Sequence, residues 1–228
     1  GAGMSADSGI PPLRDSHTGL WAMLQREYRS RDVGLQSNPQ GVWRWIVVGR
    51  YRVPYHLALD GNYALDFLAS LLPSVSVETH NVDGLHQLAG SRGVIELHGN
   101  ITRSCCSITR RPISNEWMKD AEGSPPPSPY IRNGLARPDV VWFGEVLPQE
   151  AIDSAVTIAR GCDFCFSVGT TSLVHPAASL PLIAIEHGSP LVEINPLETP
   201  LSHHADQCMR AAASQALKEI AVQARASL

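Results

Sequence analysis

Five short polar segments of this chain contain residue types that bind and transform a charged small molecule. Each mixes glycine or proline with hydroxyl, amide, carboxylate or imidazole side chains. Glycine lets a backbone approach a phosphate closely, and free N–H groups at a helix start favour its negative charge. In chain order the segments are Gly1–Ser5, Thr79–Asp83, Leu97–Gly99, Val168–Ser172 and Ile194–Pro196.

The elements that must position these segments alternate between strands and helices. Strands are expected at 75–79, 93–97, 140–143, 164–168 and 191–194, and helices at 149–161, 176–187 and 211–224. This alternation predicts an α/β fold with a doubly wound, parallel, Rossmann-like sheet. Ligands bind beyond the carboxyl ends of the strands in such sheets, where four of the polar segments fall.

The chain divides into three expected parts. A Rossmann-like domain combines residues 1–15, 75–99 and 138–228, and residues 16–74 form a helical insertion with Trp21, Trp43 and Trp45 as core anchors. Residues 100–137 form a small inserted lobe, because dense proline at 125–129 excludes helix and central strand. A glycine-rich loop normally follows a strand, so we expect residues before Gly1 or an unusual element in that strand's place.

Composition excludes several classes of function. The net charge of −4 argues against nucleic acid as a partner, and no apolar run suits a membrane span. Five cysteines without a signal-peptide pattern favour reduced thiols in the cytoplasm. We interpret Cys162 and Cys165 as small buried residues rather than as a metal or redox pair. The oligomeric state stays open.

The motifs along almost the whole chain resemble the sirtuin family. They read GAGMSADSGIPPLR, HNVDGLHQLAG, ELHGN, RPDVVWFGE, VGTTSLVHPAA and EINPLETPLS. The resemblance implies an NAD-dependent protein deacylase that acts on acyl-lysine in a protein or peptide. Within the family the chain looks most like the bacterial branch that removes acidic acyl groups.

The resemblance also implies roles for individual residues. Those assigned to the cofactor are Ala2, Gly3, Ser5, Ala6, Asp7, Ile10, Arg14, His80, Asn81, Asp83, Gly169, Thr170, Ser172 and Asn195. Those assigned to pairing with substrate peptide are Val140, Phe143, Gly144 and Glu145. Asn81, Asp83 and His98 would be catalytic.

His98 is the expected general base. In the implied reaction nicotinamide leaves the ribose, the acyl oxygen attacks the same carbon, and a ribose hydroxyl must then lose a proton. Imidazole is the side chain suited to that task near neutral pH. Glycine after His98 at a strand end favours exposure of the ring to the ligand crevice.

The chain departs from the family pattern at its metal site. Sirtuins usually hold zinc with two Cys-x-x-Cys pairs, but here Cys106 has Thr109 as its partner position, and the second pair falls near Pro129 and Arg132. One thiolate does not make a closed tetrahedral site, so we predict no zinc. The small lobe must then be held by local packing or remain mobile.

Three further departures concern activity. Leu13 replaces a usual phenylalanine, which favours leakage to NAD⁺ hydrolysis, and His80 replaces a usual glutamine and serves as a neutral hydrogen-bonding substitute or adds a pH dependence. The Tyr-x-x-Arg clamp for acidic acyl groups is replaced by Ile46 and Gly49, with Arg50 or Arg52 as weak substitutes. An apolar pocket suits acetyl or longer acyl groups.

Three functions therefore stay open from the sequence. The first is a deacylase that releases nicotinamide and O-acyl-ADP-ribose. The second is an ADP-ribosyltransferase or NAD glycohydrolase using the same pocket. The third is a non-catalytic NAD-binding fragment.

Overall fold

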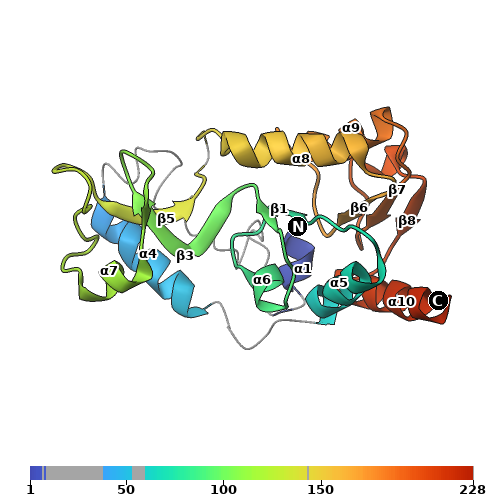
Figure 1. The fold of residues 1–228 in the computed structure, drawn as a ribbon, viewed down its shortest axis with the longest axis horizontal. Helices are drawn as coiled ribbons and strands as arrows, with labels where there is room; N and C mark the ends of the chain where they lie inside the picture. The colour runs from blue at the N-terminus through green and yellow to red at the C-terminus, as the bar shows by residue number, and fades with distance from the viewer. Residues whose placement is uncertain (7, 9–37, 53–59, 143, 228) are drawn as a thin grey trace.

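The computed structural model describes residues 1–6, 8, 38–52, 60–142 and 144–227. They form a larger and a smaller lobe, which lie side by side (Figure 1). The segment from strand β3 to strand β5 lies in the smaller lobe, together with helix α4 from earlier in the chain.

A three-stranded parallel sheet lies in the larger lobe. Its order is β6–β7–β8, formed by Cys165–Val168, Leu191–Ile194 and Gln207–Met209. All four residues of β7 are buried, as expected for a strand with neighbours on both sides and helices over both faces. The amide of Gly169 donates to the carbonyl of Ile194 at 2.8 Å, so the loops after β6 and β7 lie next to each other.

Helices cover both faces of this sheet (Figure 1). On one side lie α8 (Gln149–Gly161), the short turn η1 (Ala177–Ser179) and α9 (Leu180–Glu186). On the other side lie α5 (Asp60–Leu71) and α10 (Ala213–Ala226), and the turn η2 (Ser202–His204) precedes β8.

The contact between α5 and α10 depends on small residues. The buried positions of α10 recur every three or four residues and so share one helix face; they are Ala213, Ala216, Leu217 and Ala221. They pack against Ala64 and Leu68 of α5. Met4, from the one-turn helix α1 (Ala2–Ala6), inserts into the same cluster and thereby anchors the glycine-rich start of the chain.

A separate parallel pair, β1 (Glu78–Thr79) and β2 (Ile95–Glu96), lies between the sheet and the smaller lobe. The pairing continues beyond the two strands, since Ile95 donates to Val77 at 2.8 Å and Leu97 donates to Thr79 at 3.0 Å. Leu97 is fully buried in the cluster under α8. This pairing brings His80–Asp83, before helix α6 (Leu85–Leu88), next to His98.

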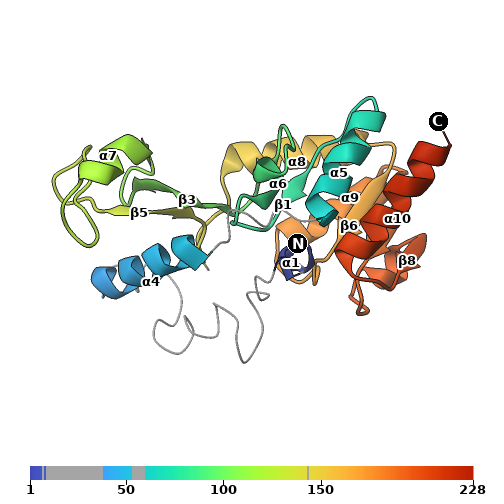
Figure 2. The ribbon, with the colours of Figure 1, turned by 90° about the horizontal axis from the view of Figure 1, so that it is seen from below.

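The smaller lobe is built on an antiparallel sheet of order β4–β3–β5. Its strands are β3 (Gly99–Cys106), β4 (Pro112–Ile113) and β5 (Ala136–Val140). Ser114 caps the N-terminus of helix α7 (Asn115–Asp120), because its hydroxyl accepts from the amide of Trp117. Helix α4 (Pro39–Arg52) runs along this lobe (Figure 2), where Trp43 packs with Ile113 and Ala136.

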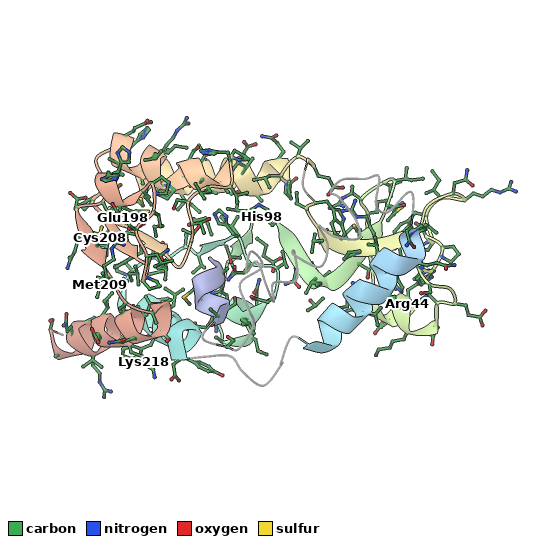
Figure 3. The ribbon with its side chains drawn as sticks, turned by 180° about the vertical axis from the view of Figure 1, so that it is seen from behind. Arg44, His98, Glu198, Cys208, Met209 and Lys218 are labelled. Atoms are coloured by element: carbon green, nitrogen blue, oxygen red, sulfur yellow. The ribbon has the colours of Figure 1, made fainter. Side chains whose placement is uncertain are left out.

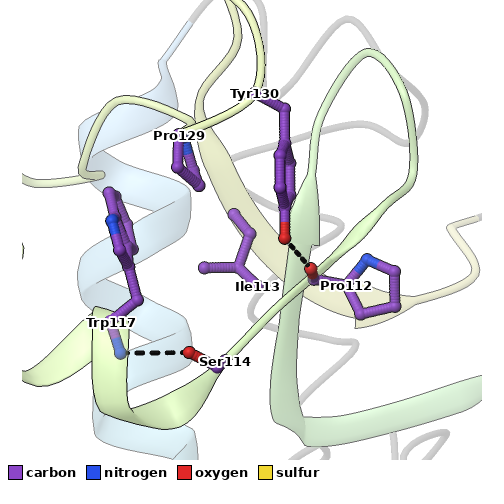
Figure 4. Close-up of a pocket in the computed structure, with 6 residues that line it drawn as sticks. All are labelled: Pro112, Ile113, Ser114, Trp117, Pro129 and Tyr130. Atoms are coloured by element: carbon purple, nitrogen blue, oxygen red, sulfur yellow. Dashed lines mark hydrogen bonds between the residues drawn. The ribbon is translucent and has the colours of Figure 1, made fainter.

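A pocket of about 360 Å³ opens in the smaller lobe (Figure 4). Its walls include Trp117, Pro129 and Tyr130, and the hydroxyl of Tyr130 donates to the carbonyl of Pro112 at 2.5 Å. It is lined by residues of this lobe alone, so it is distinct from the strand ends of the larger lobe.

The predicted α/β fold with parallel pairing is confirmed, and the helix at 149–161 and the strand at 191–194 have the expected bounds. The strand predicted at 140–143 is wrong. The strand is Ala136–Val140, and it pairs antiparallel with β3, with Val140 opposite Gly99. Within the described residues, no helix has both the length and the apolar character to span a membrane.

Candidate active site

The ends of β1 and β2 bring the three expected catalytic residues together beside α1. The hydroxyl of Ser5 donates to a carboxylate oxygen of Asp83 at 2.5 Å, and the amide of Asn81 donates to that hydroxyl at 3.0 Å and to the carbonyl of Gly1 at 2.9 Å. The other oxygen of Asp83 accepts from the amide of Leu85 at 3.0 Å. This network fixes the Asn81 and Asp83 side chains before any ligand binds.

Two backbones approach closely where glycines face each other. Gly3 donates to the carbonyl of Gly169 at 2.8 Å, and Gly169 has φ 59°, in the left-handed region. A Cβ atom built on Gly3 would lie 2.7 Å from the Cα of Gly169. Only glycine fits this contact, and the amides of Gly3 and Gly169 are both used within the fold, where they donate to the carbonyls of Gly169 and Ile194.

The loop after β6 is tied to the loop after β7. The side-chain amide of Asn195 donates to the carbonyl of Thr170 at 2.8 Å, and Ser172 has φ 54°. The hydroxyl of Ser172 is buried and has no hydrogen-bond partner among the described residues. A buried hydroxyl without a partner is costly, and a polar ligand would satisfy it.

His98 lies between the two lobes (Figure 3). Its carbonyl accepts from the amide of Val141 at 2.9 Å, and its Nδ1 is buried without a partner in the described part of the chain. Burial lowers the pKa of His98, so its ring is neutral and able to accept a proton near pH 7.

Gly99 explains how His98 is held. Its φ is 77°, and a Cβ atom there would lie 2.1 Å from the carbonyl oxygen of Asp139. No other residue type allows the chain to turn this sharply from β2 into β3.

The expected substrate segment begins at the end of β5. Its Glu145 accepts from the guanidinium of buried Arg137 at 2.6 and 2.9 Å and from the amide of Trp142 at 2.8 Å. Burial alone would raise the pKa of Glu145, but these hydrogen bonds lower it. The carboxylate therefore fixes the turn that ends β5, and Gly144 within it has φ 87°.

Some predicted residues lie outside the described part of the chain. They are Asp7, Ile10, Leu13, Arg14, Trp21 and Phe143. Ala2 and Ala6 are the ends of α1 and lie near Gly3 in the chain.

Three of the four positions expected for zinc ligands carry other side chains, namely Thr109, Pro129 and Arg132, and the fourth is Cys106. Cys106 is fully buried, and its sulfur accepts from the amide of Thr109 at 3.5 Å, while Pro129 lines the pocket of the smaller lobe. Over the residues that the structure describes, no group of three or more His, Cys, Asp or Glu side chains has the geometry to hold a metal.

Arg50, a suggested substitute for the arginine that binds acidic acyl groups, forms hydrogen bonds with strand β3. The guanidinium of Arg50 donates to the carbonyl of Ile101 at 2.6 Å, to that of Arg103 at 2.7 Å and to the hydroxyl of Ser104 at 2.9 Å. Arg50 therefore joins α4 to β3.

Two buried polar contacts support the site but were not anticipated. His86 and Asn62 lie 3.2 Å apart and connect α6 to α5, behind Asp83. Glu193 on β7 accepts from Ser202 and, at 2.8 Å, from Arg210. In the sequence, each of these contacts is marked only by a polar residue within an apolar stretch, and that pattern does not identify the residue's partner.

Known proteins resemble this chain in sequence and in fold. The Sir2 family model matches residues 1–176. An NAD-dependent protein deacylase of Mycolicibacterium paratuberculosis is 41% identical over 219 residues, which are 95% of this chain and 92% of the relative.

Two solved structures that resemble this chain contain bound molecules. A mutant Sir2 homologue in complex with 2′-O-acetyl ADP-ribose has a TM-score of 0.87 and 36% identity, with 100% of this chain and 90% of the other covered. Sir2Tm bound to a propionylated peptide has a TM-score of 0.81 and 28% identity, with 97% and 90% covered.

Proposed function

The chain belongs to the Sir2 family, and from this premise we propose that it is an NAD-dependent protein lysine deacylase with His98 as its base. One observation carries the proposal. The half-buried imidazole of His98, whose Nδ1 has no hydrogen-bond partner among the described residues, lies at the end of the strand next to the one that ends at the Ser5–Asn81–Asp83 network.

The described residues fit NAD⁺ along the strand ends. The close contact of Gly3 with Gly169 keeps side chains away from this crossing, so a ligand can approach the backbone there. The hydroxyl of Ser172, which has no partner among the described residues, is available to a phosphate or ribose oxygen. Asn195 would contact the adenosine ribose, and Asn81 and Asp83 the nicotinamide ribose and carboxamide. When bound, NAD⁺ supplies a ribose carbon with nicotinamide as its leaving group.

The protein's own contribution is to bind, orient and move a proton. His98 would take the proton of a ribose hydroxyl, so that this oxygen receives the acyl group released from lysine. The products would be nicotinamide, O-acyl-ADP-ribose and free lysine. The extended segment around Val140, held by Glu145 and Arg137, would pair with the substrate backbone as an added strand.

Product analysis tests this function. The protein is incubated with NAD⁺ and with acetyl-, succinyl- and long-acyl-lysine peptides, and the products are followed by mass spectrometry. Deacylated peptide with an equal amount of O-acyl-ADP-ribose is expected. Nicotinamide release or ADP-ribosylation of a target without deacylation would reject the proposal in favour of a glycohydrolase or transferase, for which Leu13 is the sequence argument.

The base is tested by its removal. His98→Ala should lower kcat by about 10²–10⁴-fold, the usual contribution of a general base. His203→Ala is the matched control, because the His203 side chain is 78% exposed, far along the chain in η2. Equal activity of His98→Ala and wild type would reject His98 as the base.

A further inference from the structure

His80 and His98 form a ring pair at the ends of two neighbouring strands. Their ring centroids lie 5.3 Å apart and the ring planes are inclined by 34°. This separation is within the range of aromatic packing, about 4.5–7 Å. His80 leaves β1 and His98 leaves β2, so the parallel pairing of the two strands sets the contact.

His98 has few other restraints on its ring. Its Nδ1 is buried and, in the part of the chain that the structure describes, has no hydrogen-bond partner. The bond between Val141 and His98 holds the backbone carbonyl rather than the imidazole. An imidazole usually has its orientation fixed by a hydrogen bond at one ring nitrogen, so another contact must serve here.

From this geometry we propose that His80 is a positioning residue for the catalytic base: its ring packs against His98 and fixes the orientation of that imidazole. The role rests on the proposed deacylase function. It goes beyond hydrogen bonding to the cofactor, because the packing surface of the His80 ring, rather than its nitrogen atoms, provides the effect.

The electrostatics agree with contact between two neutral rings. Burial is the main cause that lowers the pKa of His80 to about 3, and the N-terminal ammonium of Gly1 and, to a smaller extent, His98 add to it. His80 is therefore uncharged at pH 7 and packs against His98 without repulsion. It is also unsuited to accept the proton itself, which leaves His98 as the base.

Kinetic constants separate positioning from cofactor binding. His80→Ala should lower kcat by about tenfold to a hundredfold, because small misplacement of a catalytic group is costly, with the KM for NAD⁺ changed little. His80→Phe should restore most of that loss, since it keeps a planar ring and removes both nitrogens. The control is His187→Ala, at the exposed end of α9. A raised KM for NAD⁺ with unchanged kcat in both His80 variants would overturn the proposal.

A double-mutant cycle gives the second test. When His98→Ala is already present, His80→Ala should lower the residual kcat no further, because the ring that it positions is gone. Additive losses would overturn the positioning role and leave the proposed function standing. No deacylation by wild-type protein would instead reject the proposed function. If circular dichroism shows that His80→Ala does not fold, His80→Asn takes its place in the cycle.

Discussion

At the scale of single residues, the burial of His98 sets how activity depends on pH. An imidazole ordinarily titrates at 6.5, and burial lowers this pKa because the charged form loses solvation. The base works only when neutral, so activity rises with pH as His98 loses its proton. The midpoint of that rise in kcat/KM should lie below 6.5.

This prediction is checked with an acetyl-lysine peptide at saturating NAD⁺ between pH 5 and 8. His203→Ala should give the same profile. A midpoint at the ordinary histidine value would mean that the ring is solvated, and a midpoint above it would mean that the ring is paired with an acid.

Local motifs were enough to name candidate residues for the site, but not to predict how these residues connect. Asn81, Asp83 and His98 stand out by type and by position after apolar runs. The bond from Ser5 to Asp83 joins residues 78 positions apart, and such pairing follows from the fold. The partners of Arg50 were not predictable either: the sequence suggested a role in binding the acyl group, whereas the guanidinium donates to carbonyls of β3.

At the scale of elements, the turn from β2 into β3 depends on Gly99. Gly99→Ala forces a side chain into a left-handed backbone and against the carbonyl of Asp139. We expect a loss of at least about 1–3 kcal/mol in unfolding free energy and a sharp loss of activity. The matched control is Gly161→Ala at the end of α8, where an added Cβ meets nothing within 4 Å. Thermal unfolding measures both, and equal melting temperatures would refute the argument.

The turn after β5 depends on one ion pair. The side chain of Arg137 is 2% exposed, so Glu145→Gln leaves a buried charge without its counter-ion. Such changes cost about 3–5 kcal/mol. Urea unfolding at pH 7 should show this loss. The control is Glu150→Gln, at an exposed position of α8, which should change the unfolding free energy by no more than about 0.5 kcal/mol.

The stabilisation provided by Glu145 should also depend on pH. The pKa of Glu145 is lowered in the folded protein, so its stabilising effect is present above the unfolded pKa and is lost as pH falls through the folded value. The stability difference between wild type and Glu145→Gln should therefore shrink in acid. A difference that stays constant from pH 7 to pH 3 would contradict this account.

Elements with a regular apolar pattern were predictable, whereas those defined by distant partners were not. Helix α8 repeats apolar residues at helical spacing, and β7 is a short apolar run before Asn195. Strand β5 reads Ala-Arg-Pro-Asp-Val and has no such pattern. It is a strand because β3 pairs with it, and pairing over that separation leaves no local signal.

At the scale of the whole molecule, the smaller lobe is held by packing against α4. Of the four positions at which the family resemblance predicts zinc ligands, only Cys106 is a cysteine, and one thiolate does not close a tetrahedral site. The lobe has instead a cluster of Trp43, Ile113 and Ala136, with Trp117 and Met118 packed against it. A helix from an earlier part of the chain thus supplies apolar contacts that stabilise the lobe.

This arrangement predicts opposite responses to metal removal and to loss of Trp43. Treatment with a chelator should leave the melting temperature and the deacylase rate unchanged, and elemental analysis should find no stoichiometric zinc. Trp43→Ala should lower the unfolding free energy by about 3–5 kcal/mol, because Trp43 is 6% exposed and its removal leaves a cavity in the lobe. Arg44→Ala, exposed on the same helix, controls for helix propensity (Figure 3). A chelator-sensitive protein in which Trp43→Ala is as stable as wild type would mean that a metal holds this lobe after all.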